Sequence, residues 1–407
     1  MTSSFQLSDR LIGIQESSTL KMNAIARDLT AKGIAIFNLT AGEPDFPILQ
    51  SVKKKAIQAI EENFSKYTAV QGVIELRQAL SKKFLQQNNL HYSPDEIIVT
   101  AGAKQAIFSF LLSVLNPQDE VLIPIPYWVS YPEIVKVAGG KPIFIPTDAK
   151  HGFKLKPETL KARLTSKTKV FILNSPSNPT GCVYSRSELE AFAHVLKGSS
   201  VMVISDEIYE KIIYDGAFTS FASISEDAWQ RTLTVNGFSK AYSMTGWRLG
   251  YAAGPKPFIS AMTLLQGQST SNANSVAQKA ALDALSLPDS ELSPMIDSFK
   301  MRCNKMVEIF SRCKLCSFVK PQGAFYFFLS IEPVLGKRYT KSVDGEGSIL
   351  LQGSEDVAFY LLNEAQVVTV PGAGFGDDRY LRLSFAVSDF FVDEGCRRIV
   401  QALERLV

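Results

Sequence analysis

The sequence predicts an α/β protein in which helices cover both faces of a mainly parallel sheet. Between residues 51 and 205, segments with the apolar spacing of amphipathic helices alternate with short apolar runs of strand length. Strands that alternate with helices in this way are typical of a parallel sheet. Two of the runs, 169–173 and 201–205, are apolar enough for strands buried on both faces. We therefore expect a ligand site beyond the carboxyl ends of the strands.

The predicted elements of this part follow the alternation in order. A helix at 20–32 precedes it. Within it, the spacing predicts helices at 51–63, 73–88, 104–115, 157–165 and 186–197, and strands at 96–100, 120–123, 142–145, 169–173 and 201–205. Two further apolar runs, at 232–235 and 249–253, enclose a segment rich in glycine and hydroxyl groups.

From about residue 290 the alternation loosens, which predicts a second, smaller α+β domain. A long helix at 293–313 opens it, with Ser293 as N-cap and Pro294 at the first helical position. An apolar run at 324–329, a helix near 355–364, a strand at 380–385 and a final helix follow. Residues 336–353 are rich in glycine and charge and predict an exposed insertion. We divide the chain into an N-terminal arm with part of the small domain (1–50), a large domain (51–290) and a small domain (291–407).

Length and composition indicate a globular enzyme. A chain of 407 residues favours two domains, and 46% hydrophobic with 20% charged residues is typical of a folded protein. The net charge of +3 supports neither a nucleic-acid nor a membrane-surface partner. The sequence has neither a signal-peptide pattern nor a run of 18 apolar residues. We expect a cytoplasmic protein, or a mature form from which a transit peptide was removed.

The cysteines and histidines favour neither a disulfide framework nor a metal site. Five cysteines, an odd number, indicate a reducing compartment. Cys313 and Cys316 form a CxxC, but no second pair at zinc-like spacing accompanies them. The three histidines are widely scattered, so we expect no histidine triad and no metal.

Lys240 and Arg248 lie in the segment between the apolar runs 232–235 and 249–253. A partly desolvated lysine loses its proton more easily and becomes a nucleophile toward aldehydes. An arginine fork suits a phosphate. A phosphorylated aldehyde would therefore satisfy both residues. Two surface side chains on a connecting loop are the alternative, and this segment alone favours neither.

Two further strand ends carry polar residues. Asp206 follows the run 201–205 directly, so it would be a poorly solvated carboxylate that needs a cation such as a pyridinium nitrogen. Tyr209 could then donate to the phenolate oxygen of the same ring. An N-cap of a following helix is the alternative for Asp206. Asn178 lies in the loop Asn-Ser-Pro-Ser-Asn-Pro-Thr-Gly, where it offers an amide to the crevice unless the loop is a plain turn.

Three other features are weaker. The small residues of 100–106 would let helix N-terminal amides approach a phosphate, although the Walker spacing is absent. Trp128 could stack on a planar cofactor or be a core aromatic. Arg382 lies on the face of its strand opposite Leu381 and Leu383, which suits a bidentate carboxylate contact, or else it faces solvent on an edge strand.

Taken together, these segments resemble the class I/II aminotransferases, the fold-type I enzymes that use pyridoxal 5′-phosphate (PLP). Within them, the chain resembles the bacterial-type aspartate aminotransferase branch, which includes prephenate aminotransferases. The resemblance runs from about Asp9 to the C-terminus and rests on LTAGEPDF, KYTAVQGVIELR, PYWVSYP, NSPSNPTG, SDEIYE, FSKAYSMTGWRLGY, PQGAFY and YLRLSF. It implies a large domain with a mainly parallel seven-stranded sheet, a smaller α+β domain, and a homodimer whose sites are shared between subunits.

The resemblance also implies roles for individual residues. Lys240 would hold PLP covalently and later move the proton between the substrate carbon and the cofactor. Asp206 would pair with the ring nitrogen, and Tyr209 and Asn178 would bind the ring oxygen. Trp128 would stack on the ring. The remaining cofactor contacts would come from Ile208 on the other ring face and, at the phosphate, from Ala103, Lys104, Arg248, Ser239 and Tyr67 of the partner subunit.

Substrate contacts follow from the same resemblance. Arg382 would bind the substrate α-carboxylate, helped by Asn178, Trp128 and the Gly42 backbone. Thr19 and Lys104 match the threonine and lysine that serve acidic substrates in the aspartate and prephenate branch. Three features depart from the pattern or add to it: GAKQA in place of GGKQA, residues 47–50 in place of an acid–Thr–Pro, and the charged segment 336–353.

The expected activity is transamination in two half-reactions, with aspartate and 2-oxoglutarate giving oxaloacetate and glutamate. Glutamate/aspartate–prephenate transamination is the alternative. Another PLP reaction, such as a β-lyase or aminocyclopropane-carboxylate synthase reaction, is a further alternative. A non-catalytic PLP-binding regulator would need a basic DNA-binding module or a lost catalytic residue, and the sequence shows neither.

Overall fold

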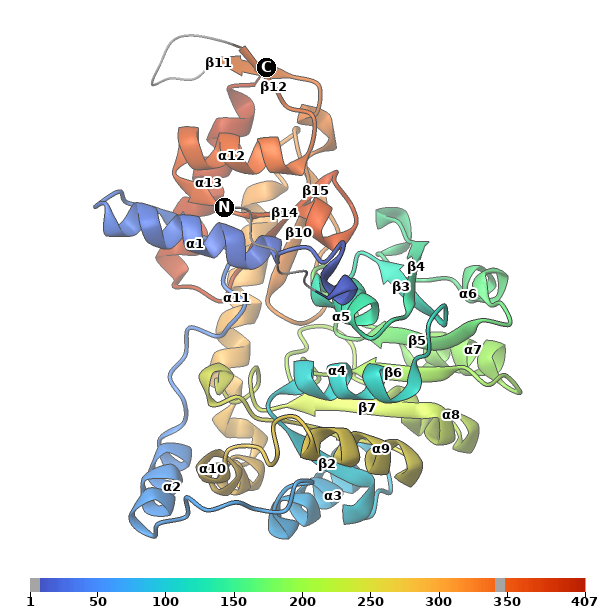
Figure 1. Ribbon diagram of the computed structural model, residues 1–407. Helices are drawn as coiled ribbons and strands as arrows, with labels where there is room; N and C mark the ends of the chain where they lie inside the picture. Colours follow the sequence, from blue (N-terminus) through green and yellow to red (C-terminus); the bar gives the residue numbers. More distant parts are fainter. Residues whose placement is uncertain (1–7, 341–347, 407) are drawn as a thin grey trace, which may run out of the picture.

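The larger part of the molecule is built on a seven-stranded sheet (Figure 1). The computed structural model describes residues 8–340 and 348–406. The strand order is β2–β8–β7–β6–β5–β3–β4, and only β8 runs antiparallel to its neighbours. The strands are β2 (Ile97–Thr100), β3 (Glu120–Ile125), β4 (Lys141–Pro146), β5 (Thr168–Asn174), β6 (Met202–Asp206), β7 (Thr232–Gly237) and β8 (Gly250–Ala253). The predicted mainly parallel α/β sheet is confirmed.

Helices cover both faces of this sheet because successive strand residues point to opposite sides. Val170 and Ile172 of β5 face one core, whereas Phe171 and Leu173 face the other. The first face is covered by α4 (Ala103–Val114), α5 (Ser130–Val137) and α9 (Lys256–Gly267). The second face is covered by α6 (Pro157–Arg163), α7 (Arg186–Leu196) and α8 (Glu226–Arg231), and near β2 by α2 (Gln50–Glu61), α3 (Ile74–Asn88) and α10 (Ser275–Ser286).

The smaller part contains a four-stranded antiparallel sheet of order β14–β15–β10–β9. N-terminal and C-terminal segments meet here, because β1 pairs with β13 and α1 lies beside β14 (Figure 1). Its strands are β1 (Phe37–Asn38), β9 (Ser317–Phe318), β10 (Tyr326–Ser330), β11 (Arg338–Thr340), β12 (Ser348–Leu350), β13 (Val367–Val368), β14 (Val370–Pro371) and β15 (Tyr380–Ser384). Its helices are α1 (Ser18–Ala31), α11 (Ser293–Phe310), α12 (Ser354–Ala365) and α13 (Asp389–Glu404). The division at residues 50 and 290 stays a prediction.

Some sequence-based details differ from the structure. The predicted N-cap at Ser293 is wrong, because Leu292 takes the cap position and already has helical torsion angles. A 3₁₀ helix at 289–291 directly precedes α11, so the chain is already helical before Ser293. The expected exposed insertion at 336–353 contains the hairpin β11–β12, whose base is buried at Leu351; residues 341–347 lie outside the described residues. No helix in the described part of the chain is long and apolar enough to cross a bilayer.

Candidate active site

The carboxyl edge of the large sheet gathers most of the predicted site residues. Asp206 is the last residue of β6, and Asn178 lies in the loop that follows β5. Trp128 comes shortly after β3, and Lys240 comes shortly after β7. Because parallel strands end at the same edge of a sheet, these four residues from distant parts of the chain meet.

Lys240 occupies the loop between the antiparallel strands β7 and β8. Its Nζ donates a hydrogen bond to the main-chain oxygen of Gly42. The same atom lies 5.9 Å from the centre of the Tyr209 ring and 5.7 Å from that of Phe325. The amine is therefore enclosed by two aromatic faces and one carbonyl, and it has few solvent contacts to keep it protonated.

The electrostatic environment also favours the neutral amine. Burial lowers the pKa of Lys240 to about 8, and the positive charges of Arg382 and Arg248 act in the same direction. The negative charges of Glu43 and Asp206 oppose them. Because desolvation dominates, the lysine has a substantial neutral fraction near physiological pH and can act as a nucleophile or base.

Arg382 lies on β15, an inner strand between β14 and β10, and is only 2% exposed. Its Nη2 donates to the Thr40 carbonyl at 3.0 Å and its Nη1 to Asn178 Oδ1 at 3.2 Å. The guanidinium stacks 4.4 Å from the Tyr326 ring centre and 5.0 Å from that of Phe375. Its buried Nε has no hydrogen-bond partner. The edge-strand alternative is therefore wrong, and the buried cation has a free donor suited to an anion.

Asp206 is a buried carboxylate, and its environment is specific. Tyr131 Oη donates to Asp206 Oδ2 at 2.6 Å, and the Ile208 amide lies 3.3 Å from Oδ1. Burial raises the pKa of Asp206 to about 6, although these two hydrogen bonds oppose the shift. A turn rather than a helix follows at 208–211, so the N-cap alternative is not realised.

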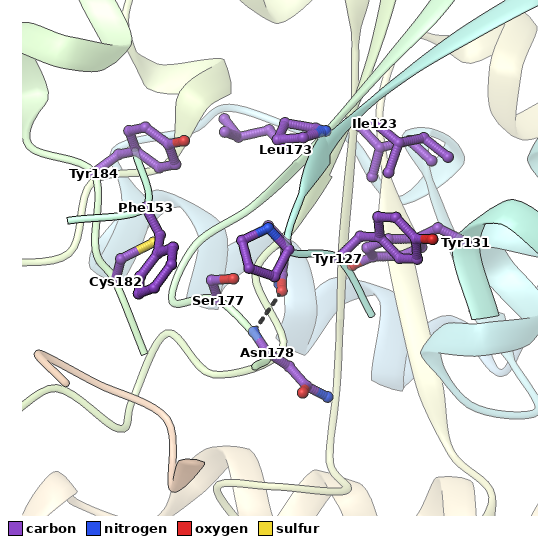
Figure 2. A pocket seen from close by; sticks show the side chains of 13 residues that line it. Ile123, Tyr127, Tyr131, Phe153, Leu173, Ser177, Asn178, Cys182 and Tyr184 are labelled. Atoms are coloured by element: carbon purple, nitrogen blue, oxygen red, sulfur yellow. Dashed lines mark hydrogen bonds between the residues drawn. The ribbon is translucent and has the colours of Figure 1, made fainter. Parts of the chain in front are cut away.

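A small cavity lies behind Asn178 and Tyr131, with room for about one water molecule (Figure 2). The Asn178 amide nitrogen of the main chain donates to Asn174 Oδ1 at 2.9 Å. Figure 2 shows that the Asn178 side chain points away from this cavity. The loop therefore aims the side-chain amide of Asn178 toward Arg382, to which it is hydrogen-bonded.

The N-terminus of α4 and Arg248 form a second cationic region. Gly102 stands at the N-cap with φ of 95°, where a Cβ would lie 2.6 Å from Arg248 Nη2. Arg248, itself left-handed at φ 51°, donates to the Thr245 carbonyl at 2.8 Å. The close approach brings the guanidinium to the N-terminus of α4, where the amides of Ala103 and Lys104 have no carbonyl partner within the helix. Helix N-terminal amides beside a guanidinium are suited to a phosphate.

The Lys104 side chain lies against the Trp128 ring. Lys104 Nζ lies 4.9 Å from the centre of the Trp128 ring, and Trp128 packs edge-to-face on Tyr131 at 5.3 Å. Partial burial and the charge of Arg248 lower the pKa of Lys104. The Lys104 amine therefore lies on the Trp128 ring and near enough to Arg248 for the two positive charges to repel each other.

The remaining predicted residues differ in how far they are buried. Ile208 and Ser239 are buried next to Asp206 and Lys240 along the chain. Thr19 is half-buried in the first turn of α1, which approaches η8 (Gly372–Phe375). Tyr67 lies in the loop between α2 and α3 and is 91% exposed, so this chain does not pack it into its own site. Its role in a partner's site stays a prediction. Among the described residues, no three His, Cys, Asp or Glu side chains are grouped as a metal site requires.

Comparison with known proteins decides the family. The model for "Aminotransferase class I and II" matches residues 34–399. The chain belongs to this family. The aminotransferase is 46% identical over 402 residues to a bifunctional aspartate aminotransferase and glutamate/aspartate-prephenate aminotransferase of Petunia hybrida, covering 98% of the chain and 82% of that relative. It is 44% identical over 400 residues to a probable aspartate/prephenate aminotransferase of Rickettsia conorii, covering 98% of each.

Solved structures agree with this assignment. The aspartate aminotransferase of Rhizobium meliloti superimposes with a TM-score of 0.94 at 41% identity, over 99% of the aminotransferase chain and 100% of that structure. The Thermus thermophilus enzyme with maleate superimposes with a TM-score of 0.90 at 37% identity, over 98% and 100%. The aminotransferase therefore has the aspartate aminotransferase fold, as the sequence predicted.

Sequence reasoning missed several residues of this aminotransferase site. Tyr131 binds Asp206 from the first turn of α5, and its main-chain amide donates to the carbonyl of Trp128, which precedes the helix. Tyr326 stacks on Arg382 from the neighbouring strand, where the two are diagonal neighbours. The sequence could not single out the Thr40 carbonyl, because every residue has a main-chain carbonyl group.

Proposed function

We propose that this aminotransferase uses PLP to transfer the amino group of aspartate to 2-oxoglutarate, giving oxaloacetate and glutamate. The supporting observation is the pairing of a partly buried, easily deprotonated Lys240 with a buried Arg382 that has a free Nε. An amino acid needs both: a base near its α-carbon and a cationic fork for its α-carboxylate.

The residues present fit PLP. The glycine at position 102 leaves the amides of Ala103 and Lys104 beside Arg248, which suits the phosphate. The buried Asp206, with its pKa of about 6, is ionised near neutral pH and needs a cation, which the ring nitrogen would supply. When bound, PLP supplies an aldehyde for amino-group exchange and an electron-accepting ring.

Further side chains would complete the cofactor site. The hydroxyl of Tyr209 lies 2.9 Å from that of Tyr326, and burial raises the pKa of Tyr209 well above its ordinary value, so it remains a neutral hydrogen-bond donor. Tyr209 and Asn178 would bind the ring oxygen, and Trp128 and Ile208 would cover the ring faces. Ser239 would add a hydroxyl near the phosphate.

The protein's own groups then act on the substrate. Arg382 holds the α-carboxylate and, with Asn178, fixes the orientation of the α-carbon. Lys240 removes the α-proton, because its amine is partly neutral near physiological pH. With PLP bound, Lys240 would also be placed to return this proton to the cofactor side, and water would then have to release the 2-oxo acid before one half-reaction is complete.

Lys104 favours amino acids and 2-oxo acids that carry an acidic side chain. Its ammonium group would attract a distal carboxylate, and Thr19 would contact the same acidic group, as the resemblance implies. Prephenate is the second candidate acceptor, because the relatives from Petunia hybrida and Rickettsia conorii are named for it. Residues 47–50 depart from the acid–Thr–Pro of the family pattern. Within them, Ile48 and Leu49 pack against the core to which α2 and α3 contribute. The departure therefore contributes two apolar side chains to the packing of this core.

A homodimer is supported by exposed apolar side chains on α2, on α9 and in the loop that carries Tyr67. Ile57, Ile60 and Leu264 are exposed, and Tyr67 is the most exposed of the large apolar side chains in the described residues. We propose that Tyr67 binds the cofactor phosphate of the partner's site. A cytoplasmic location accords with five unpaired cysteines.

The test replaces Lys240 by alanine and assays amino donors against 2-oxoglutarate, oxaloacetate and prephenate. We expect a folded Lys240→Ala variant without turnover, and a wild-type enzyme that converts the bound cofactor from its aldehyde to its amine absorbance when aspartate is added. Full activity of Lys240→Ala would refute the assignment. Release of ammonia with pyruvate, or of a cyclic amino acid, would instead indicate a lyase or a cyclising enzyme. PLP binding without turnover would indicate a regulator.

A further inference from the structure

The turn that carries Asp206 and Tyr209 also carries two buried acids that the proposed mechanism does not use. Asp206 and Tyr209 contact tyrosines of the site, whereas Glu207 and Glu210 contact polar groups on other elements. Both pairs are three residues apart along the chain. The turn therefore has one face toward the proposed cofactor and one face toward the protein interior behind it.

Glu210 is held by two residues at the end of α3. Lys83 Nζ forms an ion pair with Glu210 Oε1, and Asn88 Nδ2 donates to Glu210 Oε2 at 2.9 Å. Lys83 Nζ also donates to Asn88 Oδ1 at 2.9 Å. All three side chains are less than 10% exposed, so they form a closed triangle away from water.

Glu207 forms a second anchor on the same side. Its Oε1 accepts from Ser205 Oγ at 2.8 Å and from Ser220 Oγ at 2.7 Å, whereas its Oε2 has no partner. Burial and the negative charge of Glu210 raise the pKa of Glu207 to about 8. Glu207 is therefore mainly neutral at pH 7, whereas Glu210 forms the ion pair with Lys83.

A buried ion pair is a poor device for stability alone. The desolvation of two charges offsets most of their attraction, and apolar replacements of similar volume are often as stable. Such groups are better explained where they fix one arrangement of the chain. The turn needs this, because it has no helix to hold it and only isolated backbone bonds such as Glu210 N to the Glu207 carbonyl at 2.9 Å.

We propose that Glu210, held by Lys83 and Asn88, is a positioning residue that fixes the Asp206–Tyr209 turn against the cofactor ring. The inference rests on the proposed function, because it requires PLP at Lys240. Glu210 itself does not touch the ring. It acts by holding the backbone from which the Asp206 carboxylate and the Tyr209 hydroxyl extend.

The main test removes the polar triangle without leaving a buried charge unpaired. The triple variant Lys83→Met/Asn88→Leu/Glu210→Met should keep a Tm close to that of the wild type. We expect its PLP-free form to bind PLP about tenfold more weakly, and the absorbance of its bound cofactor to titrate at a shifted pH. We expect kcat to fall at least about tenfold, because displacements near 1 Å cost about that much or more, with a smaller change in the KM for 2-oxoglutarate. Wild-type PLP affinity and titration in this variant would overturn the proposal.

A second variant covers the case in which the triple variant does not fold. Glu210→Asp keeps the charge but shortens the side chain by one carbon, so the turn must move toward α3 to keep its partners. We expect weaker PLP binding and a shifted cofactor titration in the same direction. Unchanged values in this variant would also refute the positioning role.

The matched control breaks another ion pair of the large domain. Arg231 Nη2 and Asp227 Oδ1 are 2.7 Å apart on α8, next to the start of β7 and therefore at the opposite ends of the strands. Asp227→Asn should lower the Tm and leave PLP affinity unchanged. If the wild-type protein binds PLP and transaminates while the triple variant binds PLP equally well, only the positioning role fails. A wild-type protein that does not bind PLP would refute the proposed function, and the positioning role with it.

Discussion

Replacing Tyr131 by phenylalanine removes one hydroxyl group from behind Asp206 and leaves the ring in place. The hydroxyl is 2.6 Å from Asp206 Oδ2, and both groups are buried. The phenyl ring can keep its edge-to-face contact with Trp128. After the change, the Ile208 amide at 3.3 Å is the hydrogen bond that remains to the carboxylate. The variant therefore tests how much of the Asp206 charge depends on Tyr131.

The magnitude follows from the strength of a hydrogen bond to a charged group. Such a bond contributes about 1.5–3 kcal/mol, and one pKa unit corresponds to about 1.4 kcal/mol. The pKa of Asp206, about 6 with the bond present, should therefore rise by about one to two units. Asp206 would change from mostly ionised at pH 7 to half or largely protonated, and a protonated carboxyl group attracts a ring cation poorly.

The assay measures the binding of pyridoxamine 5′-phosphate to the cofactor-free enzyme between pH 5 and pH 9. This form has no aldehyde, so the nucleophilicity of Lys240 does not enter. We expect the pH below which affinity is lost to move upward by about one to two units in Tyr131→Phe. Tyr127→Phe is the control, because Tyr127 stacks on Phe144 and has no hydrogen bond to Asp206. An unchanged midpoint in Tyr131→Phe would refute the reasoning.

Three further outcomes are expected. Arg382→Lys loses the planar fork, so steady-state kcat/KM for aspartate should fall about 100-fold; a loss below threefold would contradict the role of Arg382. Lys104→Met should lower kcat/KM for aspartate about tenfold and leave that for phenylalanine nearly unchanged, since only the distal carboxylate loses a partner. Burial raises the pKa of Glu207 from 4.5 to about 8, so the folded protein binds this proton more tightly than the unfolded chain does. The resulting contribution to the free energy of unfolding is complete below pH 4.5 and is lost as the pH rises through 8. Urea unfolding of the cofactor-free enzyme should show this decline, and Glu207→Gln should flatten it; an equal slope in both proteins would refute it.

Much of the fold could be predicted because its strands are buried on both faces. Runs such as 169–173 and 201–205 can be recognised from composition alone, and they became β5 and β6. The order of the strands could not be deduced from local pattern. In particular, β8 lies between β2 and β7 and runs against both, an arrangement set by long-range packing.

The site was predictable where a charged residue stands in or beside an apolar strand. Asp206 ends β6, Lys240 follows β7 and Arg382 lies within β15. Charged side chains in such apolar surroundings are unusual, so the sequence singles them out. Tyr131 was missed because a tyrosine in the first turn of a helix is equally expected as an ordinary core contact. The left-handed Arg248 could not be foreseen either, since only the close approach to Gly102 explains it.

Two main-chain carbonyls of one short segment contact the two cations of the site. Thr40 O accepts from Arg382 Nη2 at 3.0 Å, and Gly42 O accepts from Lys240 Nζ. One stretch of main chain therefore connects the guanidinium that would hold a carboxylate with the amine that would act as base. Both acceptors are backbone oxygens, so their identity does not depend on the side chains of residues 40–42. The segment from Thr40 to Gly42 should therefore accept side-chain substitutions far better than a one-residue insertion, which would displace one carbonyl relative to the other.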